Sequence, residues 1–349
     1  MHFSVKKSNF ETILFSDILL IMLSFIIVLV GLSVLILVHE LGHFVAAKYF
    51  GMWVEEFGIG FPPRLFSKRR GETTYSINLV PLGGFVKLHG ELEDAGARSF
   101  VNQSLGRRAV VLIAGVCMNL IAGWFILSAV FWIGVPPILM IDQVAAGSPA
   151  ASALVKQGDI IVGWQDPAAF IKFVTDHAGT EITLPLQREG KTLSISVTPR
   201  LNPPAGEGAL GIGLRGGGVP RQGFFAGLYQ GLRASASIVW SIISGLYVIV
   251  LAPKNIVGPV GIFSVAISTG QMGFVYLLQL LGLISLNLAV LNLLPIPALD
   301  GGRLVFVIIE KLRGKPFGKH IEQRANALGF AFLILLILAV TFKDVVGLL

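Results

Sequence analysis

The segment Val38–His43, with the sequence VHELGH, ends an almost unbroken apolar run that begins at residue 18. The run is about 21 residues long, enough for a helix to cross the roughly 30 Å hydrocarbon core of a bilayer. On such a helix, His39 and His43 lie about 40° apart on one face, so both imidazoles can bind one metal ion. Glu40 lies beside them, where its carboxylate can take a proton from a water on that metal. The segment therefore predicts most of a zinc peptidase site at the end of a membrane helix.

A His-Glu-x-x-His pattern on its own is short, and it also occurs by chance in soluble helices. Its position in this chain favours a function, because ionisable side chains at membrane depth are costly and are rarely kept without one. Three such side chains within five residues, at the end of a membrane helix, are hard to explain by packing.

The composition is that of a membrane protein. The chain has 349 residues, of which 54% are hydrophobic and 13% charged, and its mean hydropathy is +0.78. The net charge of +7 does not indicate nucleic-acid binding, because the basic residues cluster beside the apolar runs, as they do in cytoplasmic loops. The single cysteine, Cys117, lies within an apolar run, which excludes a disulfide framework and a cysteine metal site. The first apolar run is too long for a signal peptide and lacks a cleavage site, so we expect it to be retained.

Four apolar segments are interpreted as membrane spans. They are residues 18–38, 109–135, 272–290 and 328–342. A fifth apolar segment, 224–251, contains Arg233 and several serines and glycines. We interpret it as an interfacial helix. A membrane span here would invert the topology of every later segment. By the positive-inside rule, the basic segment 47–108 and the basic segment after residue 300 are cytoplasmic. Asn119, in the second span, is interpreted as a structural polar residue rather than a hydrogen-bonding partner across helices.

We expect a β-hairpin at residues 73–88 of the first cytoplasmic segment. Residues 73–80 alternate like a strand, Pro81–Gly84 form a turn, and residues 85–88 form the return strand. The turn is apolar, which favours a hairpin that dips into the membrane interface. An ordinary soluble hairpin fits the same pattern about equally well.

Residues 136–214 have the composition of a small soluble α+β domain inserted between the second and third spans. Strand-like runs and helices alternate in it, at 138–141, 149–155, 159–164, 169–177, 182–187 and 192–197. This order resembles a PDZ domain in the permuted bacterial arrangement, in which Leu210, Gly211 and Ile212 belong to the loop that binds a peptide carboxylate. The turn Gln165–Pro167 departs from the Asn-Gly turn usual at that point, and a small β-rich domain of another kind is the alternative.

A second motif, Asn292–Gly301, ends the third span. Its two prolines, Pro295 and Pro297, break the helix. Non-helical backbone at this depth is tolerated only where it is buried in protein or lines a wet cavity. Asp300 is therefore expected to point at a site, at the same depth and on the same side as His43, although the two are 257 residues apart (300 − 43).

The two motifs together resemble those of the site-2 protease family, the M50 intramembrane zinc metalloproteases. Over nearly its whole length the chain is more similar still to the bacterial regulator of sigma-E protease group. The resemblance implies that Asp300 completes the binding of one zinc ion per chain, together with His39 and His43. It also implies that Asn292 contacts the substrate or stabilises the transition state.

The resemblance further implies that the hairpin binds substrate by strand addition. The hairpin residues expected to contact substrate are Ile77, Leu79, Gly83 and Gly84. Well-known relatives carry two PDZ domains in tandem, whereas this chain has room for one.

The expected architecture is a polytopic α-helical membrane protein with about four transmembrane helices, a membrane-associated β-hairpin and one inserted PDZ-like domain. Its expected divisions are an N-terminal tail (1–17), two helices with the hairpin (18–135), the PDZ-like domain (136–214), an interfacial helix with a Gly-Pro-Val-Gly-Ile loop (215–269), and two last helices (270–349).

The expected function is regulated intramembrane proteolysis in a bacterial inner membrane. The substrates are transmembrane proteins first truncated by another protease, such as anti-sigma factors or signal-peptide remnants, and no nucleic acid takes part. The active site is expected on the cytoplasmic side and the PDZ-like domain on the outer face. A transporter would also have a broken helix, but no internal repeat supports it. A catalytically inactive PDZ-bearing scaffold is the other alternative, and an intact Glu40 argues against it.

Overall fold

The computed structural model describes residues 2–91, 95–188, 191–204, 206–251, 258–315 and 317–348. The chain divides into two compact units, one formed by residues 1–129 together with 228–349 and the other by residues 130–227. Each unit has its own hydrophobic core.

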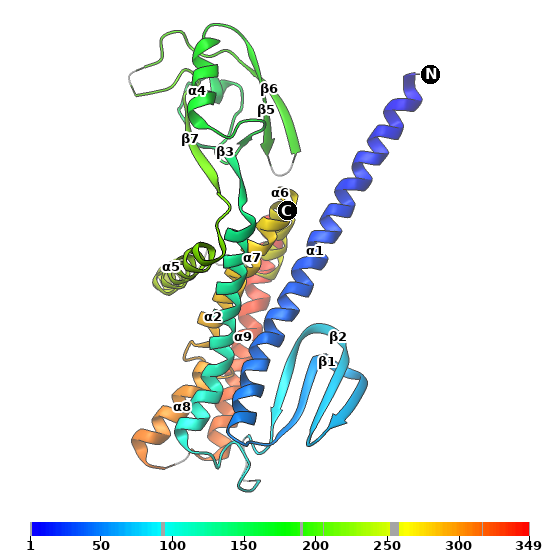
Figure 1. Ribbon diagram of the computed structural model, residues 1–349, viewed down its shortest axis with the longest axis vertical. Helices are drawn as coiled ribbons and strands as arrows, with labels where there is room; N and C mark the ends of the chain where they lie inside the picture. The colour runs from blue at the N-terminus through cyan, green and yellow to red at the C-terminus, as the bar shows by residue number, and fades with distance from the viewer. Residues whose placement is uncertain are drawn as a thin grey trace. The chain divides into compact units, whose positions relative to one another are not determined.

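The first unit is built on long helices, which Figure 1 shows running largely side by side. The helices with residues in this unit are α1 (His2–Tyr49), α2 (Leu105–Ile133), α5 (Phe224–Leu251), α6 (Pro259–Met272), α7 (Phe274–Asn292), α8 (Asp300–Arg313) and α9 (Lys319–Leu348). Four helical segments are long and apolar enough to cross a membrane: Ile21–Tyr49, Leu105–Ile133, Phe274–Asn292 and His320–Val346. Each of the four expected spans falls on one of them. The expected tail, residues 1–17, is helical from His2 onward and continues into α1.

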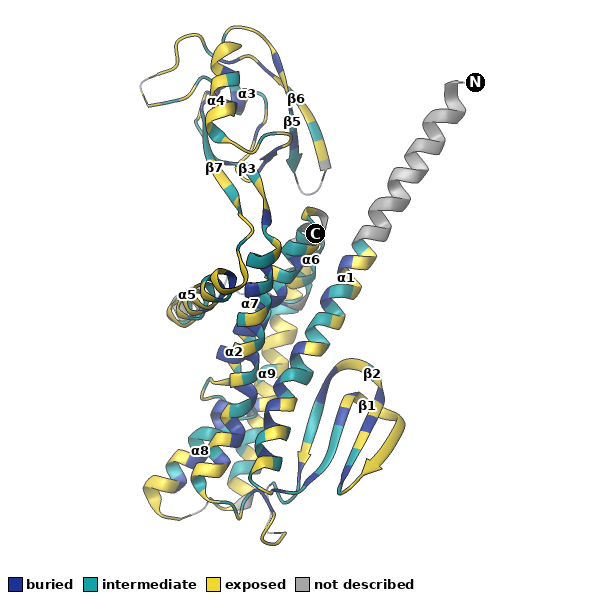
Figure 2. Cartoon of the chain, viewed as in Figure 1, coloured by how far each residue is buried: buried dark blue, intermediate teal, exposed yellow. Residues whose placement is uncertain are grey.

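Few residues of α1 and α9 are buried inside the protein, as Figure 2 shows along α9. Only 17% of the most apolar window of α1 and 6% of that of α9 are buried. Apolar surface on this scale is rare on soluble monomers. Lipid tails can cover it, because a helix satisfies its own backbone hydrogen bonds.

The helix α5 is not among the membrane-crossing candidates found in the described part of the chain. Figure 1 shows it nearly end-on, across the direction of α2 and α7. The Trp124 indole of α2 donates a hydrogen bond to the Leu228 carbonyl, at 2.9 Å. A Cβ on Gly231 would lie 2.2 Å from the Ser128 hydroxyl, so the two helices approach closely there.

A two-stranded sheet of β1 (Val54–Arg70) and β2 (Thr73–Leu88) lies beside α1 in the first unit. The predicted hairpin between the two halves of β2 is wrong, because those halves pair with β1 and not with each other. Phe57 lies opposite both Tyr75 and Val86. Residues 54–59 therefore run between the two halves of β2, and Figure 1 shows both long strands bending back on themselves.

The strand β1 was not expected, because glycines and prolines interrupt the alternation that predicts a strand. The same residues explain the fold. Gly60 has φ +76°, and a Cβ there would lie 2.5 Å from the Val80 carbonyl oxygen. Glycine at this position therefore allows the close approach of β2. Beyond it, residues 64–70 turn back and pair with residues 73–78.

The expected Gly-Pro-Val-Gly-Ile loop is helical, and so is much of the basic segment after residue 300. Pro259 begins α6, so the Gly-Pro-Val-Gly-Ile segment is a helix start, where a missing N–H costs nothing. The Asp344 carboxylate accepts hydrogen bonds from the Gly258 and Gly261 amides, at 2.9 and 2.8 Å. The basic segment after residue 300 is α8, which ends where Gly314 adopts the left-handed conformation, φ +66°.

The second unit contains one sheet of five strands. Its elements are β3 (Val135–Val144), α3 (Pro149–Ser152), β4 (Ile160–Ile161), α4 (Pro167–Asp176), β5 (Ile182–Arg188), β6 (Lys191–Val197) and β7 (Ile212–Val219). The strand order is β6-β5-β4-β3-β7, with antiparallel neighbours. The expected strands and helices are present with somewhat different bounds. β7 was not expected, so the predicted border at residue 214 falls inside a strand.

Candidate active site

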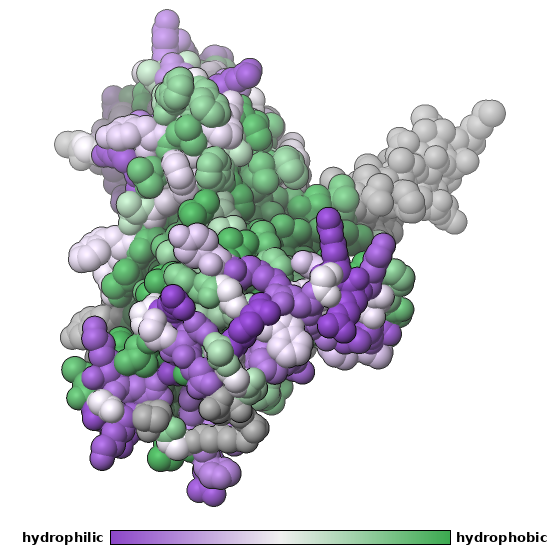
Figure 3. Space-filling model, turned by 60° about the horizontal axis from the view of Figure 1, so that its bottom comes forward, coloured by the Kyte–Doolittle hydropathy of each residue, from purple (hydrophilic) through white to green (hydrophobic). Residues whose placement is uncertain are grey.

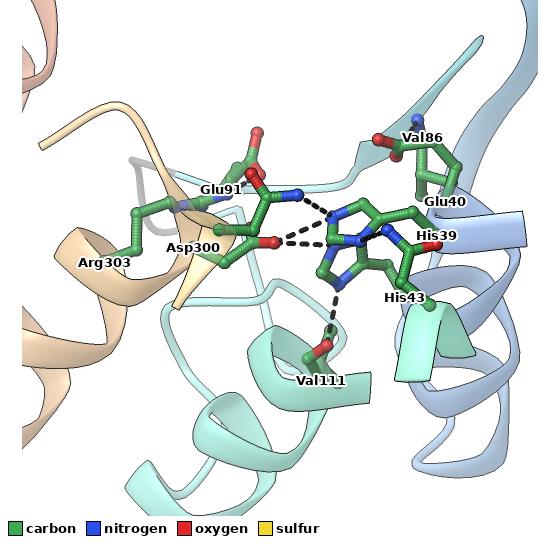
Figure 4. A network of polar contacts seen from close by, with 10 residues as sticks. His39, Glu40, His43, Val86, Glu91, Val111, Asp300 and Arg303 are labelled. Carbon is green, nitrogen blue, oxygen red and sulfur yellow. Dashed lines mark hydrogen bonds and ion pairs between the residues drawn. The ribbon is translucent and has the colours of Figure 1, made fainter. Parts of the chain in front are cut away.

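Three side chains that could hold a metal ion converge in the first unit, from helices far apart in the sequence (Figure 4). The His39 and His43 Nε2 atoms of α1 lie 2.9 and 3.2 Å from the Asp300 Oδ2 atom of α8. The two Nε2 atoms are 3.1 Å apart. Both histidines are buried. The structure thus brings together the three residues that the two motifs single out.

These donor atoms fit a zinc ion. Ligands about 2.05 Å from zinc at tetrahedral corners lie roughly 3.3 Å from one another. The observed separations of 2.9, 3.1 and 3.2 Å are close to this value. Two imidazoles and one carboxylate are also the donor types of catalytic zinc sites that keep a fourth position for water.

Two residues of α2 contact the Nδ1 atoms of the imidazoles and so orient both rings. The His43 Nδ1 atom lies 2.8 Å from the Val111 carbonyl oxygen, to which it donates. The His39 Nδ1 atom lies 3.4 Å from the Asn119 amide. A proton held on each Nδ1 leaves both Nε2 lone pairs free for the metal, the usual role of residues behind a metal ligand.

Asn119 therefore does more than the structural role expected of it. It is fully buried, and its Oδ1 atom has no hydrogen-bond partner among the described residues. The two ends of a side-chain amide are assigned from their surroundings. Turning the amide over places Oδ1 toward His39, where it accepts the Nδ1 proton, and frees the NH₂ group. The sequence offered only an isolated polar residue in an apolar helix as a signal.

Gly115 of α2 also shapes the site, although no sequence motif contains it. A Cβ at this position would lie 2.4 Å from the His43 Nε2 atom and 2.8 Å from the His39 Cε1 atom. On the facing helix, a Cβ at Gly42 would lie 2.4 Å from the Ala114 carbonyl oxygen. The two glycines thus let α1 and α2 cross closely enough for the imidazoles to lie on α2.

Asp300 is held by the backbone that precedes it. A Cβ at Gly301 would lie 2.2 Å from the Leu293 carbonyl oxygen, so the proline-containing segment folds tightly against the start of α8. The Asp300 Oδ2 atom faces the Nε2 atoms of both imidazoles, a position from which a carboxylate oxygen can share one metal ion with them.

Glu40 is not one of the three converging donors. Its Oε2 atom accepts a hydrogen bond from the Val86 amide of β2, at 3.1 Å. It lines two cavities, which Asp300 also lines. One, of about 130 Å³, is polar and includes Glu91 and Arg303. Glu40 thus borders the same two cavities as Asp300, although it is not one of the three converging donors.

The second cavity, of about 300 Å³, combines apolar side chains with two amides. The amides are Asn119 and Asn292, and the latter lies 3.4 Å from the His39 Nε2 atom. Leu288 supplies apolar lining. Apolar walls with a few convergent polar groups are the usual features of a ligand pocket.

The hairpin residues predicted to contact substrate separate into two pairs. Gly83 and Gly84 lie against α1, because Cβ atoms there would come within 2.8 Å of Ile36 and 2.5 Å of Leu37. Ile77 lies opposite both Ile59 and Phe66, so its segment is paired on both sides. Leu79 lies two residues later in the same segment, and the side chains of Ile77 and Leu79 are both exposed. Ile77 is thus not at a free strand edge.

Two of the three loop residues predicted for the second unit lie at a cavity of about 450 Å³ that residues of α4 and β7 also line. Leu210 is buried, and Ile212 begins β7. Both line this cavity, together with Phe170 and Val174 of α4. Gly211 has φ +70°, which suits glycine in the turn before β7.

Comparison with known proteins agrees with this geometry. The sequence model of peptidase family M50 matches residues 27–336. A protein of Clostridium acetobutylicum, named provisionally as a zinc metalloprotease, is 34% identical over 334 residues, covering 92% of this chain and 97% of that protein. The zinc metalloprotease RasP of Geobacillus kaustophilus is 30% identical, with 93% and 97% covered. The regulator of sigma-W protease RasP of Bacillus subtilis is 29% identical, with 89% and 95% covered.

Proposed function

The chain belongs to peptidase family M50 and is a membrane-bound zinc metalloprotease, and we propose that it cleaves transmembrane segments of proteins that another protease has first shortened. The convergence of His39, His43 and Asp300 beside Glu40, on helices long enough to cross a bilayer, carries this proposal. The three donors hold the zinc ion, and Glu40 is the catalytic base.

The chemistry follows from the positions of these side chains. Bound zinc supplies a Lewis acid that polarises the scissile carbonyl and lowers the pKa of a bound water. Glu40 takes a proton from the attacking water and later passes it to the leaving amine. The Val86 amide holds the Glu40 carboxylate in place for both transfers. Asn292 lies close enough to the histidines for its amide to donate to the oxygen that becomes negative as water adds.

We place the substrate as an extended strand beside residues 84–88 of β2. A transmembrane helix must unwind to be cut, and each backbone group left unsatisfied in a dry site costs several kcal/mol. A free strand edge supplies replacement partners. Residues 84–87 pair with β1 on one side only, whereas the Val86 amide on the other side faces Glu40. This part of β2 replaces Ile77 and Leu79 as the candidate edge.

The proposed substrates are membrane proteins of regulatory kind, such as anti-sigma factors, or remnants of signal peptides. The name of the Bacillus subtilis relative describes a regulator of sigma-W, which supports the first class. The positive-inside rule supports an active site toward the cytoplasm of a bacterial inner membrane. The unit 130–227 is proposed as a PDZ-like domain on the outer face, with Leu210, Gly211 and Ile212 at its peptide site.

Substitution of Glu40 by Gln tests the mechanism. The variant should lose cleavage of a model membrane peptide by at least about 10²-fold, the low end for general-base catalysis. Its zinc content should stay at the wild-type level, because Glu40 is not a ligand. His39→Ala is the matched comparison and should lose zinc as well as activity. Near-wild-type cleavage by Glu40→Gln would remove Glu40 from the mechanism.

A further inference from the structure

The β1–β2 sheet has two ends of opposite chemistry. Phe61 lies opposite Val80, so the turns at residues 61–63 and 81–83 share one end, and both are apolar or proline-rich. Arg70 lies opposite Thr73 at the other end, where Lys68, Arg69 and Arg70 follow one another. Figure 3 shows hydrophilic side chains gathered at the right over the near end of the sheet, with hydrophobic ones along its rim.

Contacts with α1 give the depth of each end. The Ser33 hydroxyl donates to the Pro81 carbonyl at 2.7 Å, within the membrane-crossing segment of α1. The Lys48 ammonium binds the Glu72 carboxylate at 2.8 Å, beside the cationic end. Fifteen residues separate the two contacts along α1 (48 − 33), which is about 22 Å of helix. If the apolar turns lie inside the bilayer, the cationic end is at its surface.

The three cations have no carboxylate partner among the described residues. Glu72, the acid nearest in sequence, is bound by both Lys48 and Arg98, whose hydrogen bonds lower its pKa to about 2. Lys68, Arg69 and Arg70 are exposed and border a hollow of about 530 Å³ with Tyr75.

Large apolar side chains accompany these charges on the same strand. Leu65 and Phe66 are 64% and 61% exposed. Exposed aromatic and aliphatic side chains beside lysines and arginines are typical of surfaces that lie at a membrane interface. An acidic peptide would satisfy the charges but would leave this apolar surface and the apolar turns in water. The combination favours a lipid surface as the occupant.

We propose that Lys68, Arg69 and Arg70 bind the phosphate groups of anionic phospholipids and so hold the sheet at a fixed depth in the membrane. The cations lie at the surface while the turns at 61–63 and 81–83 reach into the hydrocarbon. Each basic residue near an anionic membrane surface increases the constant for membrane binding about fivefold. Because residues 84–88 belong to the same sheet, anionic lipid also sets the depth of the strand beside Glu40.

The test measures the depth of the sheet in the whole protein. A fluorescent label is placed on Leu82→Cys in a Cys117→Ser background, and the protein is reconstituted in phosphatidylcholine with or without phosphatidylglycerol. Quenchers attached to the lipid tails then report how deeply the label lies. We expect quenching to increase severalfold when phosphatidylglycerol is present. The combined variant K68Q/R69Q/R70Q should lose this dependence while keeping its zinc.

A matched variant, K311Q/R313Q/K315Q, removes the same number of charges from the basic segment around the end of α8 and should keep the dependence. The proposal is overturned if wild-type label depth is the same in both lipids, or if both triple variants lose the dependence equally. It is also overturned if K68Q/R69Q/R70Q keeps the depth response and weakens only the binding of a substrate with an acidic cytoplasmic tail. Label depth does not depend on cleavage, so failure here leaves the proposed protease activity untouched.

Discussion

Two groups of residues make the metal site. His39, Glu40 and His43 share a short motif on α1, and Asp300 belongs to a motif in a broken helix, whereas Gly115 and Asn119 of α2 lie against the imidazoles. Gly115 and Asn119 have no such spacing pattern. Their roles depend on where α2 crosses α1, which no local pattern encodes.

A methyl group at Gly115 should disturb the metal site directly. The added Cβ would lie 2.4 Å from the His43 Nε2 atom, so the imidazoles must move away from α2. Misplaced ligand rings typically cost about 10–100-fold in metal affinity. We expect Gly115→Ala to lose zinc affinity in this range, measured by competition with a chelator.

Gly106→Ala is the control for this prediction. Gly106 lies in the same helix, and a Cβ there would meet no atom within 4 Å. This variant should bind zinc as the wild type does. Equal zinc affinity in the two variants would mean that the imidazoles can move away from α2 without weakening metal binding.

At the scale of elements, helices were easier to predict than strands. Long apolar runs decide a membrane helix almost by length alone. The β1 strand contains Gly58, Gly60 and two prolines, which resemble turn residues in a local pattern. In the structure, these glycines and prolines let the backbones approach closely and change direction. The segment therefore forms a sheet in which each long strand folds back, and not the expected hairpin. Pairing partners distant in sequence decide such a sheet, and periodicity does not reveal them.

Cross-linking can locate the strand that receives the substrate. In a Glu40→Gln, Cys117→Ser background, a cysteine at Val86 should form a disulfide with a cysteine near the scissile bond of a bound substrate. A cysteine at Ile77 should not, although Ile77 is 49% exposed, because β1 occupies both sides of its segment. The cross-link is measured by gel mobility without reductant. Cross-linking at Ile77 as fast as at Val86 would contradict substrate addition beside residues 84–88.

The second unit contains an ion pair between a buried aspartate and an arginine. Asp159 is 1% exposed, and Arg188 binds both of its carboxylate oxygens at 2.7 Å. Burial raises the pKa of Asp159, but hydrogen bonds from Arg188 and the Lys156 amide outweigh it, so the pKa is lowered. The ionised Asp159 therefore increases the free energy of unfolding, and this contribution is fully present at pH values above about 4, the usual pKa of an aspartate. This stability is lost as the pH falls through the lowered value.

Asp159→Asn should remove this dependence and destabilise the unit by about 2 kcal/mol at neutral pH, the size of a charged hydrogen bond. The measurement is hydrogen–deuterium exchange of β4 and β5 in the whole protein, corrected for intrinsic exchange at each pH. In the wild type, protection should fall below about pH 4, whereas in Asp159→Asn it should be weaker and flat. Parallel pH curves for the two proteins would assign the acid sensitivity to another group.

At the scale of the whole molecule, the sequence shows an inserted domain but not where to cut it. Composition changes near residue 136, yet β7 runs past the expected border at residue 214 to Val219. Val135 lies opposite Val219, so the two ends of the insertion are neighbouring strand partners. A cut at 214 would leave half of β7 unpaired, whereas a cut at 219 leaves two adjacent chain ends.

Removing residues 135–219 and joining Gly134 to Pro220 through a short glycine-serine linker should therefore preserve the membrane unit. The Gly134 and Arg221 backbones already lie close, since a Cβ on Gly134 would be 3.0 Å from the Arg221 amide nitrogen. If the domain excludes bulky substrates, the shortened protein should cut model substrates with long outer domains that the wild type leaves intact. Both proteins should cut a fully truncated substrate at the same rate, which shows that the membrane unit is intact. Glu40→Gln should abolish cleavage in both. Cleavage is followed on a substrate series whose outer domains differ only in length. If the shortened protein still rejects the long members of that series, the domain is not the filter, and selection must occur where the substrate enters the bundle.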